Sequence, residues 1–495
     1  MKKILLIFIT LTAILNASSH IPGYKVFITS EDIENAGIAR IGDLLFLLND
    51  LHLSTIDGYT WKLSINGLAP LQHQNWLIMI DDRQVSTSFF DTQNVNMLPI
   101  TVSDIDSVVV FMTPQIYMGH FIDSGLMHIR TKNSERGFSI GGSFYAGNET
   151  GDPGPYKYTR LYSPNVDRIG KGGALNMSFR TNNYFVRGNF IVEEHILTDF
   201  AMRRRIHSAS TDGWGSFDRY APSIEFGFNT ARTDHKVYLN QSHAPHYYLF
   251  FKALGREVPM DYSILQAGYT GRYQLHPNHQ LKLDAHFSSN RADKANNIYN
   301  LDFDVDFQKL NAKFEYQQTG RKYDWRVGST FEQTRFKTGY VLKDNRITTG
   351  AVYNRFLYQP NPSAAYLFSL MNRFTTSDFA TKAAVSGQWA IRRNHVIQAA
   401  LSLSRRLFRE DNSFWYWTRN GYQLLDDQWL NYSFAGRFKN SIHLTSDVAW
   451  HWDLRPEISL KTSAYYRKFR HILLEEQSFI YFPYYCAVRA STDIF

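Results

Sequence analysis

Gln280-Leu281-Lys282-Leu283-Asp284-Ala285-His286-Phe287 is the stretch that decides the fold, because apolar and polar side chains alternate along its whole length. The same alternation runs from Leu301 to Gln308, where odd-numbered residues are apolar and even-numbered ones polar. Successive side chains of a β-strand point to opposite faces, so a period of two predicts strands with one apolar and one polar face. The pattern continues at 322–327 and 457–464 and, in a weaker form, at 184–191.

Two kinds of connection separate these runs. Short turn signals stand at 181–183, 276–279, 319–321 and 393–394, whereas 147–172 and 410–428 are long polar joins. Short turns that alternate with long loops are typical of a membrane β-barrel, and the region after residue 133 has room for roughly 14 to 16 strands.

The length of the runs favours a membrane barrel over a soluble β-protein. A strand that spans a bilayer needs about 9 to 11 residues, whereas strands of soluble sheets average about 5 to 6. In lipid every backbone polar group must be paired within the protein, so such a sheet closes on itself. The 15% aromatic content fits aromatic belts at the membrane interfaces, and the mean hydropathy of −0.34 fits alternating faces. A soluble β-rich protein remains the alternative.

The N-terminus has the build of a secretory signal peptide. Lys2 and Lys3 precede an apolar stretch from Ile4 to Leu15, and small residues at 16–19 predict cleavage after Ala17. No later segment reaches the roughly 18 apolar residues of a transmembrane helix.

Charge and cysteine content exclude several classes. Cys486 is the single cysteine, which excludes an intramolecular disulfide or a cysteine-based metal site. The net charge is +8, but lysine and arginine are scattered, so nucleic acid is not an expected partner. The densest basic group, 203–205, predicts a loop that contacts anionic lipid head groups or is simply solvated.

Residues 21–133 combine short strand-like runs with apolar residues at helical spacing, a pattern that predicts a mixed α/β unit. Strands are expected at 24–28, 63–65, 76–80, 105–111 and 126–131. Thr29 or Ser30 is expected to cap a helix that ends near Gly37, and apolar residues at helical spacing predict a second helix over 41–51. Turns are expected at Asn66-Gly67 and after Ile80.

Six ordered blocks in this unit resemble the plug domain of TonB-dependent outer-membrane receptors. Val26–Ile33 resembles the family's opening strand and helix cap, and Ile41–Leu45 the helix that follows. The other blocks are Leu63–Gly67, Leu77–Arg83, Asp104–Val110, and Gly119 with Ser124–Lys132. The chain departs from the family at Asn66, at Asp82 in place of a glycine, and at 111–114, where only Pro114 is kept.

The resemblance implies an α/β plug domain inside an antiparallel transmembrane β-barrel of the cell outer membrane. The expected parts are a signal peptide (1–17), the plug (18–133) and the barrel (134–495). Because the family has 22 strands, the resemblance implies either a reduced barrel or one shortened at its C-terminus. The implied function is uptake of a scarce ligand such as an iron chelate or cobalamin, driven by the TonB complex. No TonB box is seen between the cleavage site and the first plug strand. This favours the alternative, a plugged barrel that is a surface receptor, adhesin or structural protein, whereas the retained plug favours transport.

Candidate site residues come from the plug motif alone. Their expected role is structural or gating, and they are Asn66, Gly67, Asp81, Asp82, Arg83, Pro114 and Gly125. Outer-membrane lipid, lipopolysaccharide and an unidentified extracellular ligand are the other expected partners. No catalytic motif, cofactor site or metal site is predicted, since His243/His246 and His276/His279 are pairs in loop-like sequence. Asp302, Asp304 and Asp306 share one strand face, either solvated or, as the alternative, an acidic stripe in the lumen.

Overall fold

The computed structural model describes residues 22–23, 25–38, 41–48, 51–55, 61–65, 77–85, 88–89, 92–93, 95–123, 125–134, 136–148, 169–196, 216–251, 256–294, 304–338, 345–376, 378–392, 394–407, 422–423, 429–430, 441–455, 458–470, 473–476, 487–490 and 493–494. The signal-peptide residues, Asn66, Gly67, Arg203–Arg205, Asp302 and Cys486 lie outside these residues, and the expectations for them stay predictions.

A five-stranded mixed sheet forms the centre of the N-terminal unit. Its order is β1 (Lys25–Thr29), β8 (Ile105–Phe111), β11 (Leu126–Thr131), β4 (Leu77–Ile80) and β5 (Arg83–Val85). β11 runs parallel to β4, and the other neighbours are antiparallel. Four of the five predicted strands are therefore confirmed in this sheet, two of them to the residue, and β5 is an addition. The fifth, predicted at 63–65, is β3 (Trp61–Ile65) in a separate two-stranded sheet.

The first helix is α2 (Ser30–Asn35), and Thr29 is its N-cap. The Thr29 hydroxyl accepts from the Asp32 backbone N–H, and the Asp32 carboxylate accepts from the Thr29 N–H, which is a capping box. The second expected helix is wrong in type and length: η1 (Ile41–Leu47) is a 3-10 helix, and Leu51 already begins a strand. Its apolar side chains still pack inward, because Ile41, Leu44, Leu45 and Leu48 join the plug core.

Shorter elements complete this unit. They are β2 (Leu51–Thr55), β3 (Trp61–Ile65), β6 (Ser88–Phe89), β7 (Thr92–Gln93), η2 (Val95–Met97), η3 (Val102–Asp104), β9 (Gln115–Tyr117) and β10 (His120–Ile122). β9 and β10 form a hairpin that the sequence analysis missed. Its two turn residues, Met118 and Gly119, both have positive φ (47° and 81°), as a two-residue type I′ hairpin turn requires.

A sixteen-stranded antiparallel sheet, here called the wall, follows the plug. Its first strands are β12 (Gly137–Asn148), β13 (Ile169–Arg180), β14 (Tyr184–Ile196), β15 (Ser216–Asn229), β16 (Thr233–Phe251), β17 (Arg256–His276), β18 (His279–Lys294) and β19 (Asp304–Thr319). The others are β20 (Tyr323–Thr338), β21 (Asn345–Asn361), β22 (Ala364–Thr375), β23 (Phe379–Arg392), β24 (His395–Arg406), β27 (Ser441–Arg455), β28 (Ile458–Arg470) and β31 (Asp493–Ile494). Four short strands lie outside the wall: β25 (Tyr422–Gln423), β26 (Trp429–Leu430), β29 (Leu473–Glu476) and β30 (Ala487–Ala490).

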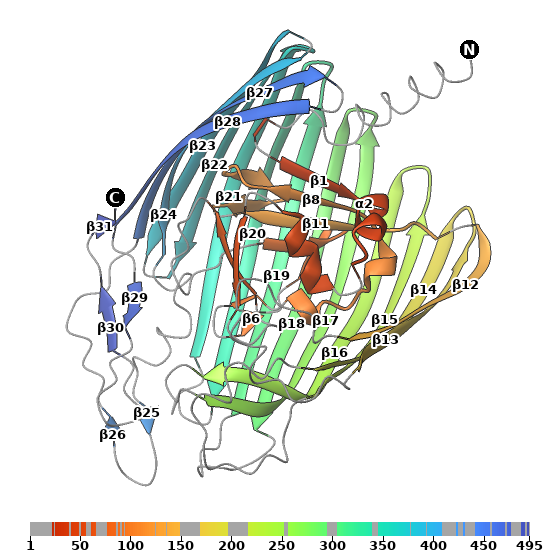
Figure 1. The fold of residues 1–495 in the computed structure, drawn as a ribbon. Coiled ribbons are helices and arrows are strands. Elements are labelled where there is room, and N and C mark those ends of the chain that lie inside the picture. The colour runs from red at the N-terminus through yellow and green to blue at the C-terminus, as the bar shows by residue number, and fades with distance from the viewer. Residues whose placement is uncertain are drawn as a thin grey trace.

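The wall curves around the plug. Figure 1 shows the plug strands β1, β8 and β11 in the hollow of the curved sheet, with β12 at one edge and β28 near the other. Within the described residues, β12 pairs with β13 alone, so ring closure stays a prediction. The fold expected from the sequence, an α/β plug inside an antiparallel β-barrel sheet, is otherwise the one observed.

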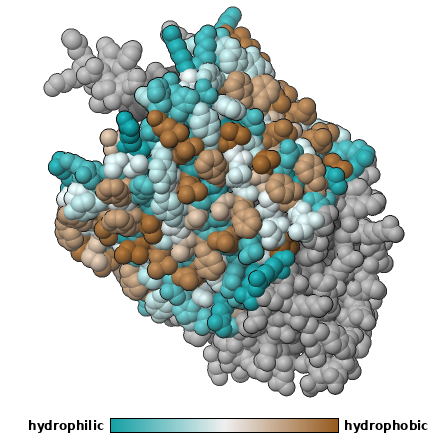
Figure 2. Space-filling view, turned by 180° about the vertical axis from the view of Figure 1, so that it is seen from behind, coloured by the Kyte–Doolittle hydropathy of each residue, from teal (hydrophilic) through white to brown (hydrophobic). Residues whose placement is uncertain are grey.

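The two faces of the wall differ as the alternation predicts. On β18 the polar residues Lys282, Asp284 and His286 face the plug, whereas Leu283 faces outward and is 42% exposed. Figure 2 shows the convex side, with apolar side chains gathered across its middle and hydrophilic ones toward its margins. Within the described part of the chain, no helix has the length and apolar character needed to cross a bilayer.

One alternating run has the opposite orientation to its neighbours. Strand register pairs Phe307 with the inward Asn290, and Asp306 with the outward, exposed Arg291. Asp306 therefore belongs to the convex side near the long-loop end, and the lumenal acidic stripe is wrong for this residue. The expectation of a loop at His243 is also wrong, because His243 lies within β16 and its Nε2 is 2.7 Å from an Asp261 carboxylate oxygen.

Aromatic side chains cluster on the convex side near the short turns. Tyr323 stacks on Phe356 with ring centroids 6.3 Å apart, and Tyr366 meets Trp389 at 5.8 Å. The row continues on other strands with Phe228, His235, Tyr269, Tyr273, His279, Tyr316, Trp325, Tyr358, His395, Trp450 and Trp452. Such a row is expected where the margin of a barrel meets lipid head groups.

Candidate functional site: the interface between plug and wall

The turn after β4 places three consecutive charged residues against the wall. Asp81 has φ 53°, a left-handed conformation that aspartate tolerates better than most residues. Its carboxylate accepts from the Thr131 backbone N–H at 2.9 Å, and its own N–H donates to the Ile129 carbonyl at 2.8 Å. The turn is thereby fixed to β11, so Asp82 and Arg83 are presented at defined positions.

The three residues contact neighbouring strands of the wall. Asp81 lies 3.7 Å from Arg187 of β14, and Asp82 pairs with Arg272 of β17 and, at 3.8 Å, with Lys236 of β16. Arg83 lies 3.6 Å from Glu225 of β15, and its guanidinium stands 4.2 Å over the Tyr238 ring. These three residues, here called the turn anchor, tie the plug to four neighbouring strands.

The charges of the wall set the protonation of Asp82. Burial raises the pKa of this carboxyl, but the positive charges of Arg272 and Lys236 outweigh burial, so its pKa is below the ordinary value. Asp82 is therefore ionised at neutral pH. The family has glycine at this position, but the strained φ of this turn falls on Asp81, so Asp82 needs no glycine.

The β9–β10 hairpin forms a second attachment, here called the hairpin anchor. Ile116 and Phe121 pack against Ala351, Tyr353, Met371 and Ala384 of the wall. The Ile116 N–H donates to the Ser369 hydroxyl at 3.1 Å, and the Lys313 ammonium donates to the Met118 carbonyl at 3.0 Å. This anchor is therefore both apolar and hydrogen-bonded.

Asp123 ends the hairpin in a buried ion cluster. Its carboxylate lies 3.0 Å from the Lys382 ammonium and 3.4 Å from the Arg406 guanidinium, and all three side chains are less than a tenth exposed. Burial raises the pKa of Asp123, but the two cations outweigh it and hold the pKa at about 2. Asp123 was not among the predicted site residues, although it directly follows the apolar pair Phe121 and Ile122.

A chain of hydrogen bonds joins the two anchors through His128. Its Nε2 meets the Asp81 carbonyl, which can only accept, so Nε2 carries the proton. Burial lowers the pKa of His128, so the ring is neutral and Nδ1 accepts from the Tyr117 hydroxyl at 2.8 Å. Tyr117 belongs to β9 and Asp81 to the turn anchor, so this imidazole connects the two anchors by hydrogen bonds. A histidine within the apolar strand 126–131 was the signal that could have identified it.

A third group of contacts holds residues 98–104. Arg219 of β15 donates to the Leu98 carbonyl and pairs with Glu193 at 2.6 Å, and both side chains are buried. The Asn189 amide donates to the Asp104 carboxylate at 2.8 Å. These contacts attach the plug to β14–β17, β19 and β21–β24 of the wall, mostly through polar groups.

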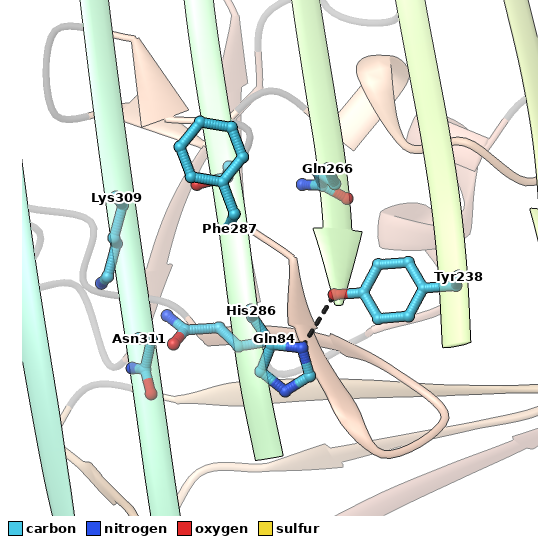
Figure 3. Close-up of a pocket in the computed structure, with 8 residues that line it drawn as sticks. Gln84, Tyr238, Gln266, His286, Phe287, Lys309 and Asn311 are labelled. Atoms are coloured by element: carbon cyan, nitrogen blue, oxygen red, sulfur yellow. Dashed lines mark hydrogen bonds between the residues drawn. The ribbon is translucent and has the colours of Figure 1, made fainter. Parts of the chain in front are cut away.

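A small polar pocket lies beside the turn anchor, between β5 and the wall (Figure 3). Gln84 reaches from the plug toward His286, whose Nδ1 is 2.9 Å from the Tyr238 hydroxyl. Lys309 also lines the pocket, and its ammonium pairs with Glu332 at 2.9 Å. The other lining residues are Gln266, Phe287, Ser288 and Asn311. The pocket therefore offers mainly neutral amide and hydroxyl groups.

The remaining predicted site residues serve the plug itself. Pro114 is buried between β8 and β9, directly before the first strand of the hairpin. Gly125 has φ 151°, and its carbonyl accepts from the Leu77 N–H at 3.0 Å, which starts the parallel pairing of β4 with β11. Neither residue contacts the pocket, and a gating role for the set stays a prediction. No group of three or more potential metal ligands occurs among the described residues.

Comparison with known proteins finds similarity in structure only. No family model matches the sequence, and no curated protein matches it. The siderophore receptor PirA from Pseudomonas aeruginosa superposes with a TM-score of 0.68 at 11% identity, over 96% of this chain and 79% of that one. A variant of the ferric enterobactin receptor PfeA from the same organism, in complex with enterobactin, gives 0.68 at 11% identity over 92% and 73%. The ferric yersiniabactin uptake receptor FyuA from Yersinia pestis gives 0.61 at 10% identity over 92% and 73%. The chain therefore has the plugged β-barrel fold of these siderophore receptors, as its resemblance to the TonB-dependent receptors implied.

Proposed function

We propose that the protein is an outer-membrane receptor of the TonB-dependent type that takes up a scarce ligand. Of the two ligand classes considered, an iron chelate is favoured over cobalamin. The observation that carries the proposal is the plug–wall interface. The plug contributes the carboxylates of Asp81 and Asp82, and the wall contributes the facing cations Arg187, Arg272 and Lys236. Ionic and hydrogen-bonded contacts of this kind can separate into water, so they suit a plug that is held at rest and moves during transport.

The apolar convex face supports the outer-membrane location. Only a closed barrel can place a β-sheet in lipid with all its backbone groups paired. The aromatic row marks one margin of the apolar face, and the structural neighbours are receptors for ferric siderophores. The apolar face and the aromatic row fit a barrel in the outer membrane, and the likeness in fold to siderophore receptors favours an iron chelate over the other ligands that the sequence left open.

A plugged barrel without TonB-driven transport is the second candidate, and the hairpin anchor favours it. Ile116 and Phe121 are buried against the wall, and Asp123 sits in a buried ion cluster. Separation of this anchor would expose apolar surface and leave charges without partners, which is costly. A permanently seated plug would suit a surface receptor, adhesin or structural protein.

Uptake in cells with and without TonB separates the two candidates. Iron-starved cells that express the protein would be given radiolabelled ferric enterobactin, ferric yersiniabactin or cobalamin in parallel. Accumulation of one probe that requires both this protein and TonB supports transport. Accumulation that does not depend on TonB, or binding of a probe without accumulation, supports the second candidate.

A reversible cross-link tests whether the plug moves. Asp82→Cys and Arg272→Cys, in a Cys486→Ala background, replace a direct plug–wall ion pair by two thiols. A short reducible bifunctional thiol reagent should block uptake, and reduction should restore it. Each single-cysteine variant with the same reagent is the control, and uptake that continues through the cross-linked protein would argue against plug movement at this anchor.

A further inference from the structure

Four cations lie at short turns of the wall. Arg232 lies between β15 and β16, Arg321 and Lys322 lie between β19 and β20, and Arg392 is the last residue of β23. All four residues are exposed. Short turns of an outer-membrane barrel face the periplasm, whereas the long loops face the cell surface. These residues, here called the turn cations, therefore border the periplasm.

The turn cations have no ion pair within the part of the chain that the structure describes. The carboxylates that follow them most closely on the same margin are already engaged with other groups. These pairs are Asp234 with Arg272 at 3.7 Å, Asp324 with Arg326 at 2.8 Å and Asp453 with His451 at 2.8 Å. The positive charge of the four residues is therefore available to a partner.

Backbone hydrogen bonds hold these turns against the next strand of the wall. The Arg232 carbonyl accepts from the Gln274 N–H of β17 at 2.7 Å, and the Lys322 carbonyl accepts from the Gln359 N–H of β21 at 2.7 Å. The turns are thus fixed before any partner arrives. A partner that binds them does not have to order the backbone first, which removes one cost of association.

The spacing of the turn cations selects the shape of the partner. The turns that carry them recur every four strands, between β15 and β16, between β19 and β20, and between β23 and β24. Neighbouring strands are about 4.8 Å apart, so successive cationic turns are roughly 19 Å apart. The Debye length at physiological ionic strength is only about 8 Å, so one small anion does not reach two of these turns. A partner that engages the whole row is therefore extended and has several negative groups.

The turn cations also lie beyond the aromatic row. Tyr323 and Trp389 belong to this row, and Arg321 and Arg392 lie two and three residues further toward the tips of their turns. Aromatic side chains in such a row mark the level of the lipid head groups. The turn cations therefore face the aqueous layer beneath the membrane.

We propose that the turn cations bind a carboxylate-bearing polymer of the periplasm, the peptidoglycan layer. A guanidinium fork matches the geometry of a carboxylate and can donate two parallel hydrogen bonds to it. Carboxylates that recur along an extended polymer match cations that are too far apart to share one anion. This assignment rests on the outer-membrane location but not on uptake of any ligand.

Cosedimentation of the purified full-length protein in detergent with isolated, protease-treated peptidoglycan sacculi tests the proposal. In Arg232→Gln/Arg321→Gln/Arg392→Gln the amount of sacculi needed for half-maximal binding should rise at least about tenfold, since one cation near an anionic surface contributes roughly a fivefold factor. Wild-type binding should weaken with added salt and should fall by a similar factor when the carboxylates of the sacculi have been amidated.

The matched control is Lys171→Gln/Arg291→Gln/Arg405→Gln. It removes the same charge from three side chains that are also more than half exposed but lie near the long loops. This variant should sediment with sacculi as the wild type does. Heat-modifiable gel mobility would confirm that both variants are folded.

Three results would overturn the proposal: equal sedimentation of the turn variant and the control, equal binding of amidated sacculi, or loss of bound phosphatidylglycerol in native mass spectra of the turn variant while its sedimentation is unchanged. The last result would assign the turns to lipid. Uptake assays on the same variants keep this inference separate from the proposed function. Loss of sedimentation with normal uptake supports the site, and failure of uptake in the wild type leaves the sedimentation result valid.

Discussion

Asp123 is a plug carboxylate that two wall cations share, and its loss should weaken the hairpin anchor. Asp123→Ala leaves Lys382 and Arg406 buried without this partner, which should lower the free energy of plug unfolding by about 3 kcal/mol. Urea unfolding measures this loss of stability, with the protection of the hairpin amides from hydrogen exchange as the readout. Asp106→Ala, a change at an exposed plug carboxylate, is the control and should have little effect. An equal effect of the two substitutions would remove Asp123 from the anchor.

The same carboxylate predicts a pH dependence. Its folded pKa of about 2 lies below the ordinary 3.8, so its contribution to stability is complete above about pH 4 and disappears as the pH falls toward 2. Exchange protection at Phe121 and Ile122, corrected for intrinsic exchange rates, should therefore be constant from neutral pH to about pH 4 and then decline. Asp123→Asn should lack this decline. A wild-type decline centred near pH 6 would contradict the assignment.

Gly119 combines backbone strain with a close approach to the wall. An added Cβ would lie 2.5 Å from Lys313 Cδ and 2.9 Å from the Tyr353 hydroxyl oxygen. Gly119→Ala should therefore cost the roughly 1–2 kcal/mol of a left-handed alanine and also loosen the hairpin. Gly37→Ala is a matched control, because Gly37 has φ 66° and nothing within 4 Å of an added Cβ. The contrast is read from hairpin hydrogen exchange, which should rise only in the Gly119 variant.

At the scale of elements, alternation predicted the wall strands and their faces far better than their exact limits. The run 280–287 predicted which side chains of β18 face lipid, because a period of two admits only two orientations. The run 301–308 gave the wrong orientation for its acidic residues. At the long-loop end of β19, which lies beyond the apolar part of the convex face, the apolar residues face inward and the polar ones outward. The hairpin anchor was not predicted, since Asp123 and His128 acquire partners only when segments distant in sequence meet.

A charged side chain on the apolar outward face should destabilise the folded protein strongly at the middle of a strand and only weakly near its end. Phe314 is 48% exposed on the convex side of β19, and Gln308 lies on the same face nearer the long loops. Phe314→Arg should destabilise the folded barrel by about 2–4 kcal/mol, whereas Gln308→Arg should cost about 1 kcal/mol or less. Unfolding in lipid vesicles measures both. Equal costs would mean that this face does not lie in lipid.

At the scale of the whole molecule, the plug and the wall were both predictable but their relation was not. Ordered plug motifs and the long alternating runs predicted the two parts, because local propensity and periodicity depend only on residues that are close in sequence. The attachments between them join residues such as Asp82 and Arg272, almost two hundred positions apart. The structure therefore adds the plug–wall interface, on which the proposed movement depends.

The central claim is that the wall faces lipid on one side and the plug on the other, and site-directed spin labelling along β20 tests it most directly. Single cysteines would replace residues from Trp325 to Glu332, one at a time, in a Cys486→Ala background reconstituted in lipid vesicles. Labels at odd positions should be accessible to oxygen but not to a water-soluble nickel reagent, and labels at even positions should be shielded from both. Accessibility to the water-soluble reagent at every odd position, without a period of two, would contradict the account.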